Sequence, residues 1–85
     1  MSGIHYKKRV LMLLAEGFEL IETSCFTDVL AWASFQEHVD ITVTSASRSG
    51  AVKSAFGGFV VTPELSISEL DLSVYDALAV PGGME

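Results

Sequence analysis

The chain has 85 residues, 49% of them hydrophobic, and a formal net charge of −6 at pH 7. This apolar content excludes a disordered chain, and the acidic balance disfavours nucleic acid and anionic membranes, because both present phosphate charge. A chain of this size buries only about 60% of the surface that it exposes when unfolded. We therefore expect part of its apolar surface to need a partner.

The number of cysteines and the charged residues near the N-terminus indicate the cellular compartment. Cys25 is the single cysteine, so no internal disulfide is possible, and no apolar run reaches the ~18 residues of a membrane span. Basic residues at 7–9 precede a short apolar run, as in a signal peptide, but Glu16, Glu19 and Glu22 interrupt it. We therefore expect a cytoplasmic protein that does not enter a membrane.

The first third of the chain has the pattern of a strand followed by a helix. Residues 9–15 form an apolar run without alternation, which is typical of a strand buried on both faces of a parallel sheet. After a loop at 16–18, apolar residues recur at spacings of three and four over 19–35, which predicts a helix with a wide buried face. On that face we expect Cys25 and Trp32 to lie in the core.

The middle of the chain predicts a second strand and a hairpin. Residues 39–46 alternate apolar and polar side chains and are rich in β-branched residues, which favours a strand near a sheet edge. Segments 51–56 and 59–62 flank Gly57-Gly58. Two glycines tolerate positive φ angles, so we expect an antiparallel hairpin with a two-residue turn.

The last third predicts a short helix and a third parallel strand. The helix is expected over 66–72 and the strand over 77–80, ending at Pro81. The resulting β-α-β-hairpin-α-β order predicts an α/β, flavodoxin-like, doubly wound and mainly parallel sheet, with the first strand between the second and the third. The outer edge of 77–80 then lacks a partner, so we expect residues 1–85 to be the N-terminal part of a single domain, incomplete without a C-terminal half.

In such a sheet, ligands bind beyond the carboxyl ends of the strands, where the winding direction reverses. Segments 15–22 and 80–83 are expected to meet there, which makes Gly17 and Glu19 candidates for substrate binding. Glu22 heads a helical column of apolar residues. Desolvation would raise its pKa, whereas its place in the first helical turn favours the anion. It is therefore either a catalytic carboxyl or an ordinary helix-start residue.

Gly82 and Gly83 form the second candidate catalytic element. Glycines after an apolar strand and a proline allow two backbone N–H groups to point into the crevice as an oxyanion hole, although Pro-Gly-Gly is also common in plain turns. His5 and His38 are isolated in sequence, which disfavours a metal site. Neither a hydroxyl-rich phosphate loop nor G-x-G-x-x-G follows the first strand, so no cofactor is expected.

Two motifs carry a resemblance to a known family. They are AEGFELIET at 15–23, followed by DVL at 28–30, and YDALAVPGGM at 75–84. In this order and at this separation they resemble the N-terminal half of the ThiJ/PfpI superfamily, nearest the branch of the parkinsonism-associated protein deglycase. The resemblance covers essentially the whole chain but about half of a family member.

The resemblance implies a site built on a cysteine nucleophile at a strand-to-helix elbow, in the half that these residues do not contain. It implies that Glu22 hydrogen-bonds that cysteine and that Gly82 and Gly83 help to form the oxyanion hole. Cys25 lies on the first helix and does not replace the nucleophile. Positions 31–32, often basic in relatives, are Ala31 and Trp32 here.

The resemblance also implies a function. We expect the intact protein to act on small carbonyl compounds or glycated groups, as a glyoxalase or deglycase does, and the 85 residues alone to be inactive. The implied partners are the C-terminal half and a second copy in a homodimer. Alternatives are a redox-sensing or chaperone-like stress protein that uses the same cysteine, or a cysteine-dependent hydrolase, amidase or protease-like enzyme.

Overall fold

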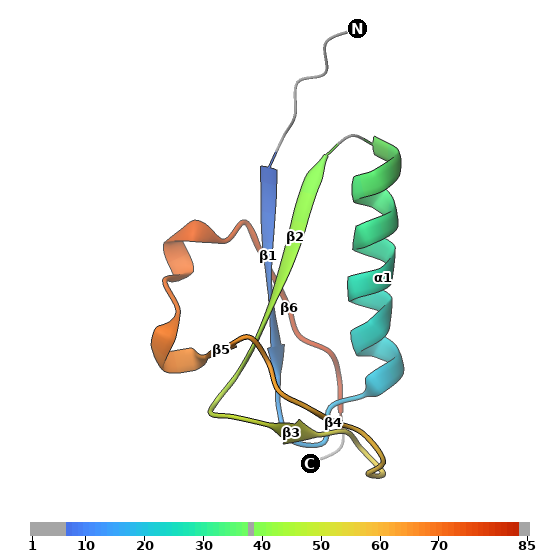
Figure 1. Cartoon of the computed structure of the whole chain (residues 1–85), viewed down its shortest axis with the longest axis vertical. Coiled ribbons are helices and arrows are strands. Elements are labelled where there is room, and N and C mark those ends of the chain that lie inside the picture. Colours follow the sequence, from blue (N-terminus) through green and yellow to red (C-terminus); the bar gives the residue numbers. More distant parts are fainter. Residues whose placement is uncertain (1–6, 38, 84–85) are drawn as a thin grey trace, which may run out of the picture.

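The structure is a computed structural model that describes residues 7–37 and 39–83. Within these residues it forms one α-helix, six strands and two short 3-10 helices (Figure 1). Their bounds are β1 Lys7–Leu14, α1 Leu20–Glu37, β2 Asp40–Ser47, β3 Val52–Lys53, β4 Val60–Val61, β5 Leu65–Ser66, η1 Ile67–Glu69, η2 Leu72–Val74 and β6 Ala77–Ala79.

The main sheet has four strands in the order β5-β2-β1-β6, and each neighbouring pair is parallel. β1 is central: it pairs with β2 along its full length and with β6 over Val10–Met12. This arrangement confirms the predicted α/β fold class and the place of the first strand between the second and third. Among the described residues, none pairs with the outer edge of β6.

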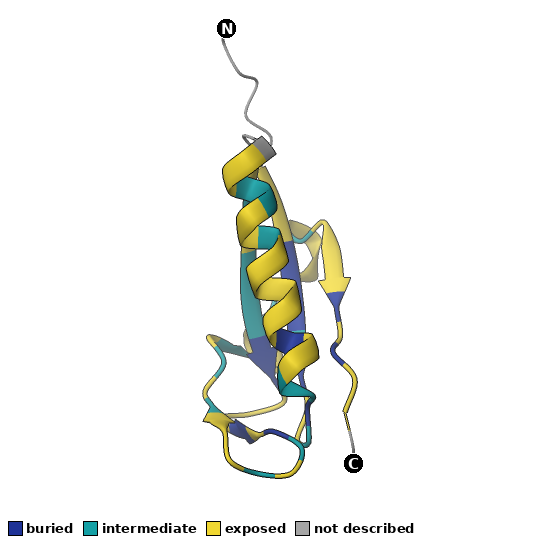
Figure 2. Ribbon diagram, turned by 90° about the vertical axis from the view of Figure 1, so that its right-hand side faces the viewer, coloured by how far each residue is buried: buried dark blue, intermediate teal, exposed yellow. Residues whose placement is uncertain are grey.

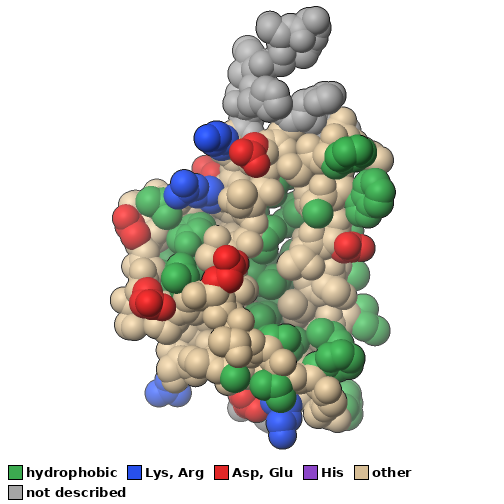
Figure 3. Space-filling model, in the orientation of Figure 1, with side chains coloured by type: hydrophobic (Ala, Val, Ile, Leu, Met, Phe, Trp, Pro, Cys, Tyr) green, Lys and Arg blue, Asp and Glu red, His purple; other side chains and the backbone are tan. Residues whose placement is uncertain are grey.

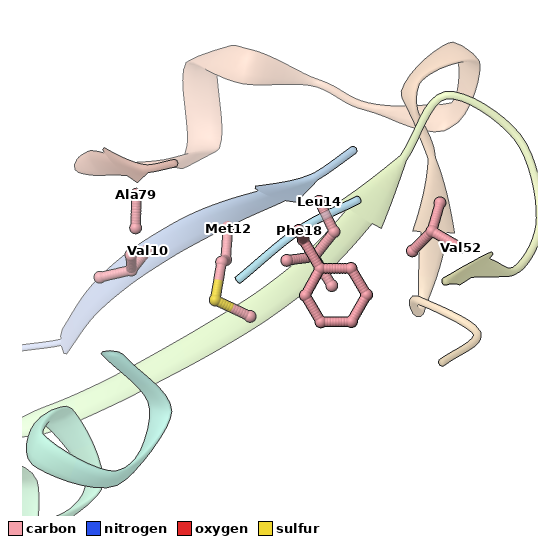
Figure 4. Packing of buried hydrophobic residues seen from close by; sticks show 6 residues of the cluster. All are labelled: Val10, Met12, Leu14, Phe18, Val52 and Ala79. Carbon is pink, nitrogen blue, oxygen red and sulfur yellow. The ribbon is translucent and has the colours of Figure 1, made fainter. Parts of the chain in front are cut away.

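β1 is central because its sequence is apolar on both sides of the pleat. Val10, Met12 and Leu14 belong to the main buried cluster, which Figure 4 shows together with Phe18 from the following loop. Successive residues of a strand point to opposite faces. Leu11 therefore points to the other face of the sheet, where it is 1% exposed.

α1 covers one face of the sheet with short or modest side chains. Thr23 is buried, and Leu20 and Leu30 are partly buried against the cluster below. Ser34 is also half-buried and donates its hydroxyl proton to the carbonyl oxygen of Val39 at the start of the β2 segment. The helix is therefore held to the sheet by a narrow stripe of residues.

The outer side of α1 carries the larger apolar side chains and is exposed (Figures 2 and 3). Ile21, Val29 and Phe35 are exposed, and Trp32 is 59% exposed. The predicted wide buried face is therefore wrong for the described residues, and so is the predicted burial of Trp32 and Cys25, which is also exposed. The reason is that only one layer, the sheet, lies against the helix.

No helix within residues 7–37 and 39–83 is both long and apolar enough to cross a membrane.

The predicted hairpin pairing is confirmed, but its turn is longer than expected. β3 and β4 are antiparallel over two residues each, and the Ser54 N–H then donates to the Phe59 carbonyl oxygen over 2.9 Å. Three consecutive residues between them have positive φ: Phe56 at 64°, Gly57 at 72° and Gly58 at 87°. A two-residue turn is wrong here because the loop reverses over four residues, one of them a phenylalanine.

The predicted single helix over 66–72 is replaced by β5, which pairs with β2, and by the two 3-10 helices. Side-chain caps divide the segment. The Glu69 carboxylate accepts from the Ser66 N–H over 2.8 Å, and the Asp71 carboxylate accepts from the Ser73 N–H over 3.1 Å. A cap at each start stabilises two separate turns instead of one continuous helix.

Candidate functional site

The loop after β1 passes between the hairpin and the last segment of the chain. Its centre is Phe18, whose side chain is only 2% exposed. The Phe18 carbonyl oxygen accepts from the Ala55 N–H over 2.8 Å, and the Gly17 N–H donates to the Lys53 carbonyl oxygen over 2.7 Å. Gly17 has φ of 84°, which a glycine adopts without strain. The loop is thereby fixed to the hairpin by its backbone.

Phe18 is a site-forming residue that sequence reasoning missed. It was assigned only to the break after the first strand, between the carboxylates of Glu16 and Glu19. A bulky apolar side chain in an otherwise acidic loop was the available signal, because such a side chain is stable only when it is buried. In the structure Phe18 is buried in the main cluster and forms bridges with both Ser54 and Gly83.

The turn after β6 closes the other side of the loop. The Glu19 N–H donates to the Gly82 carbonyl oxygen over 2.8 Å, and Gly83 forms an antiparallel bridge with Phe18. A Cβ atom on Gly83 would lie 2.5 Å from the Gly17 carbonyl oxygen, so the two backbones approach too closely for any other residue. The predicted meeting of segments 15–22 and 80–83 is confirmed.

Glu22 reaches across this crossing from the first turn of α1. Its Oε1 accepts a hydrogen bond from the Gly82 N–H over 2.6 Å, a contact between residues 60 positions apart. The carboxylate is exposed, and Phe26 and Val29 after it are exposed as well. The apolar column expected to desolvate Glu22 is therefore absent within the described residues, and the main partner of the carboxylate is a backbone amide.

The two glycine amides are consequently not equivalent. The Gly82 N–H is directed at Glu22, whereas within residues 7–37 and 39–83 no group accepts from the Gly83 N–H. An N–H donor held rigidly and left free is the arrangement that stabilises a developing oxyanion. Of the two predicted oxyanion donors, only Gly83 lacks an acceptor within residues 7–37 and 39–83; its oxyanion role stays a prediction.

The other candidates lie beside this pair. Glu19 is half-buried at the start of α1, where its carbonyl oxygen accepts from the N–H and the hydroxyl of Thr23. Gly17 contributes through its backbone. The substrate-binding roles of Glu19 and Gly17 stay predictions. His5 and His38, which were considered as metal ligands, lie outside the described residues.

The chemistry available at this crossing is a carboxylate acceptor next to one free amide donor. Such a pair can accept or return a proton and can stabilise a negative oxygen. Cys25 is the chain's single cysteine, and it lies on the exposed side of α1. Among the described residues, Cys25 is therefore not part of the crossing.

A family model described as the DJ-1/PfpI family matches residues 8–85. A search of curated proteins finds no match.

Solved structures with the same fold include proteins of several descriptions. The DJ-1 superfamily protein Atu0886 from Agrobacterium tumefaciens is 36% identical, with a TM-score of 0.64 over 89% of this chain and 38% of that one. Drosophila melanogaster DJ-1beta is 31% identical, with a TM-score of 0.75 over 92% of this chain and 39% of that one. An AraC family transcriptional regulator from Pseudomonas putida is 28% identical, with a TM-score of 0.78 over 92% of this chain and 48% of that one. The chain spans less than half the length of each.

Proposed function

The chain belongs to the DJ-1/PfpI family, and on this premise we propose that Glu22 and Gly83 serve a cysteine-dependent site that acts on small carbonyl compounds or glycated groups. The nucleophilic cysteine is expected in the part of the family's length that these 85 residues do not span. The observation that supports this proposal best is the 2.6 Å hydrogen bond from the Gly82 N–H to Glu22, which fixes a carboxylate beside a free amide. Proteins of this fold have different descriptions, among them a transcriptional regulator and DJ-1beta, so the fold alone does not identify the function.

The proposed reaction begins with addition of the cysteine to an aldehyde. The sulfur forms a bond to the carbonyl carbon, the C=O electron pair moves to the oxygen, and the thiol proton passes through Glu22 to that oxygen, which gives a hemithioacetal. The Gly83 N–H donates to the oxygen while it is negative. The Gly82 N–H holds the Glu22 carboxylate in place and does not contact the substrate. With methylglyoxal, a hydrogen moves from C1 to C2 of the hemithioacetal and gives a lactoyl thioester, so that C1 is oxidised and C2 is reduced without an external oxidant. Water then adds to the thioester carbonyl, the C–S bond breaks, and lactate and the free thiol are released.

Methylglyoxal turnover by the intact protein tests this proposal. Glu22→Gln keeps the shape of the side chain and removes its basicity, so turnover is expected to fall by about 10²- to 10⁴-fold, the usual contribution of a general acid–base group. Glu16→Gln is the matched control, because the Glu16 carboxylate accepts from the Lys53 N–H in the hairpin and lies outside the proposed reaction. Equal rates for the wild type and Glu22→Gln would remove Glu22 from the mechanism.

One comparison favours a second function, oxidation sensing by the same cysteine. Toxoplasma gondii DJ-1, which is 30% identical with a TM-score of 0.74, has a structure of an oxidized form. In this reading, peroxide oxidises the thiolate to sulfenic and then sulfinic acid, and the peroxide is reduced to water. Sulfinic acid formed at low peroxide in a protein that does not turn over methylglyoxal would favour the sensor, and the converse would favour the enzyme.

We also propose that residues 1–85 are the N-terminal part of one domain that a C-terminal half completes, and that the intact domain forms a homodimer. The uncovered edge of β6 and the exposed side of α1 support this proposal. The intact mass of the natural protein is expected to include roughly 90 to 110 further residues, enough for a domain of common size. A soluble, cooperatively melting monomer made of the 85 residues alone would contradict it.

A further inference from the structure

A cavity of about 250 Å³ lies under the first half of α1, away from the Glu22 and Gly82 contact. Its walls come from the helix, β1, β2 and the segment after β4. The deepest wall residues are Met12, Leu14 and Phe18, all of them buried, and Val43 and Val61 add apolar surface at its sides. In Figure 3, hydrophobic side chains follow the furrow between the strands and the helix. The interior is therefore suited to an apolar group.

The cavity is a consequence of the distribution of side-chain size on α1. Thr23 and Thr27, one helical turn apart, line its roof. The large side chains of the helix, including Trp32 and Phe35, are on the exposed side instead. Protein interiors are normally packed without voids larger than a water molecule. Short hydroxyl side chains above an apolar floor leave a space of the size of a small organic molecule.

Two of the hydroxyl groups that line the cavity, those of Thr23 and Thr27, are arranged as acceptors. The Thr23 hydroxyl donates its proton to the Glu19 carbonyl oxygen over 2.8 Å, and the Thr27 hydroxyl donates to the Ser24 carbonyl oxygen over 3.1 Å. Each hydroxyl proton is therefore used within the helix, which leaves oxygen lone pairs for a ligand. At these two hydroxyls a ligand therefore hydrogen-bonds as a donor.

The negative charge of Glu64 at the cavity favours a positively charged ligand. Glu64 is exposed and lines the cavity, and its Oε1 accepts from the Ser45 N–H over 3.2 Å. The backbone N–H of Glu64 in turn donates to the Ser45 hydroxyl over 3.0 Å. These two bonds hold the carboxylate at the rim of the cavity. A cation is attracted to this position and a second carboxylate is repelled from it.

We propose that this cavity binds a small apolar amine, with its hydrocarbon or aromatic body between Met12 and Val43 and its ammonium group directed at Glu64. The apolar floor accounts for the body of the ligand, the acceptors for its N–H groups, and Glu64 for its charge. Neither Glu22 nor Gly82 lines the cavity, so this site is independent of the proposed reaction.

Binding of three compounds of one shape to the intact protein tests the proposal. Benzylamine, benzyl alcohol and benzoate share a ring and differ in the charge of the group attached to it. Benzylamine is expected to give saturable NMR shifts at Met12, Thr27 and Val43. Benzyl alcohol is expected to bind about fivefold more weakly and benzoate about fivefold more weakly again, because one charge interaction with a partly exposed carboxylate contributes up to about 1 kcal/mol.

Variants locate the binding. Glu64→Gln keeps an oxygen for the Ser45 N–H and is expected to remove the preference for benzylamine over benzyl alcohol. Asp28→Asn, which neutralises an exposed carboxylate on α1 outside the cavity, is the matched control and leaves the preference unchanged. Thr27→Met, at an exposed position of the cavity roof, is expected to abolish binding of both compounds. Absent saturation, equal binding of the three compounds, or unchanged preference in Glu64→Gln would overturn the proposal.

Discussion

The crossing around Phe18 and the outer side of α1 differ in how their groups are partnered. At the crossing, one aromatic side chain is 2% exposed and the backbone on either side of it is hydrogen-bonded to the hairpin and to the turn after β6. On the outer side of α1, Phe35 is 76% exposed, and its ring packs edge-on against Trp32 at 6.1 Å between ring centroids.

This difference separates the geometry that the 85 residues fix by themselves from the surface that they leave exposed. The crossing is held by backbone contacts among segments that lie far apart in the sequence, so the geometry of Glu22 and Gly83 is set within these residues. On the outer side of α1, the apolar side chains are exposed to solvent within the described residues. Apolar surface of this kind gains free energy when a partner covers it.

The largest expected effect comes from truncating the two phenylalanines. Phe18→Ala is expected to lower the free energy of unfolding of the intact protein by about 3–5 kcal/mol, because it removes a buried ring and leaves a cavity. Phe35→Ala is expected to lower it by less, because the Phe35 ring is 76% exposed within the described residues and gains burial only from the proposed C-terminal half or second copy. Denaturant unfolding measures both. Equal losses for the two variants would mean that the outer side of α1 is as buried as the crossing.

A smaller effect is expected at the two glycines of the turn. Gly83→Ala places a Cβ atom against the Gly17 carbonyl oxygen, a backbone atom that moves only with its loop, and is expected to destabilise by about 1–3 kcal/mol. In Gly82→Ala the new Cβ meets the Glu22 carboxylate, whose side chain can rotate away. We expect thermal unfolding to rank Gly82→Ala closer to the wild type. The reverse order would contradict the close backbone approach.

In the hairpin loop we expect a gain in stability. Phe56 is 87% exposed and has φ of 64°, a conformation that costs most residues about 1–2 kcal/mol and glycine almost nothing. After the greater chain entropy of glycine in the unfolded state is counted, Phe56→Gly is expected to stabilise the protein by up to about 1 kcal/mol. Phe59→Gly is the control, because Phe59 does not have a positive φ. A loss of stability in Phe56→Gly would indicate that the exposed ring has a partner.

The smallest effect is at Asp71, which caps η2 far from both surfaces. Hydrogen bonds from the Ser73 hydroxyl and the Ser73 N–H favour the charged form and lower the pKa of Asp71 from its ordinary value. The stabilisation is therefore complete above the ordinary carboxyl pKa and is lost as the pH falls through the lowered value. Ser73→Ala is expected to raise the pKa of Asp71 in an NMR titration, whereas Ser24→Ala is expected to leave it unchanged.

The sheet and the crossing were predictable because their signals are local. The uninterrupted apolar run of β1 identifies a central parallel strand, and the glycines of Pro81-Gly82-Gly83 mark a turn that another backbone approaches. Once the strand order is known, the carboxyl ends of β1 and β6 lie side by side, and the segments that follow them meet.

The remaining features depended on contacts that a pattern does not specify. The spacing of apolar residues identifies the apolar stripe of α1. It does not determine which side of the helix packs on the sheet, and in the structure that side contains Thr23. The difference between the Gly82 and Gly83 amides depends on the position of the Glu22 carboxylate, which accepts from the Gly82 N–H although the two residues are 60 positions apart in the sequence. β5 is only two residues long, too short for an alternating pattern to show.

Exchange of the Gly82 and Gly83 amide protons in the intact protein separates the two glycines, because the Gly82 N–H is bonded to Glu22 and the Gly83 N–H has no acceptor in the part of the chain that the structure describes. We expect slow exchange and a downfield NMR position for the Gly82 amide, fast exchange for the Gly83 amide, and loss of the protection of Gly82 alone in Glu22→Ala. Equal exchange of the two amides in the wild type, or a Gly82 amide that Glu22→Ala leaves unchanged, would contradict this expectation.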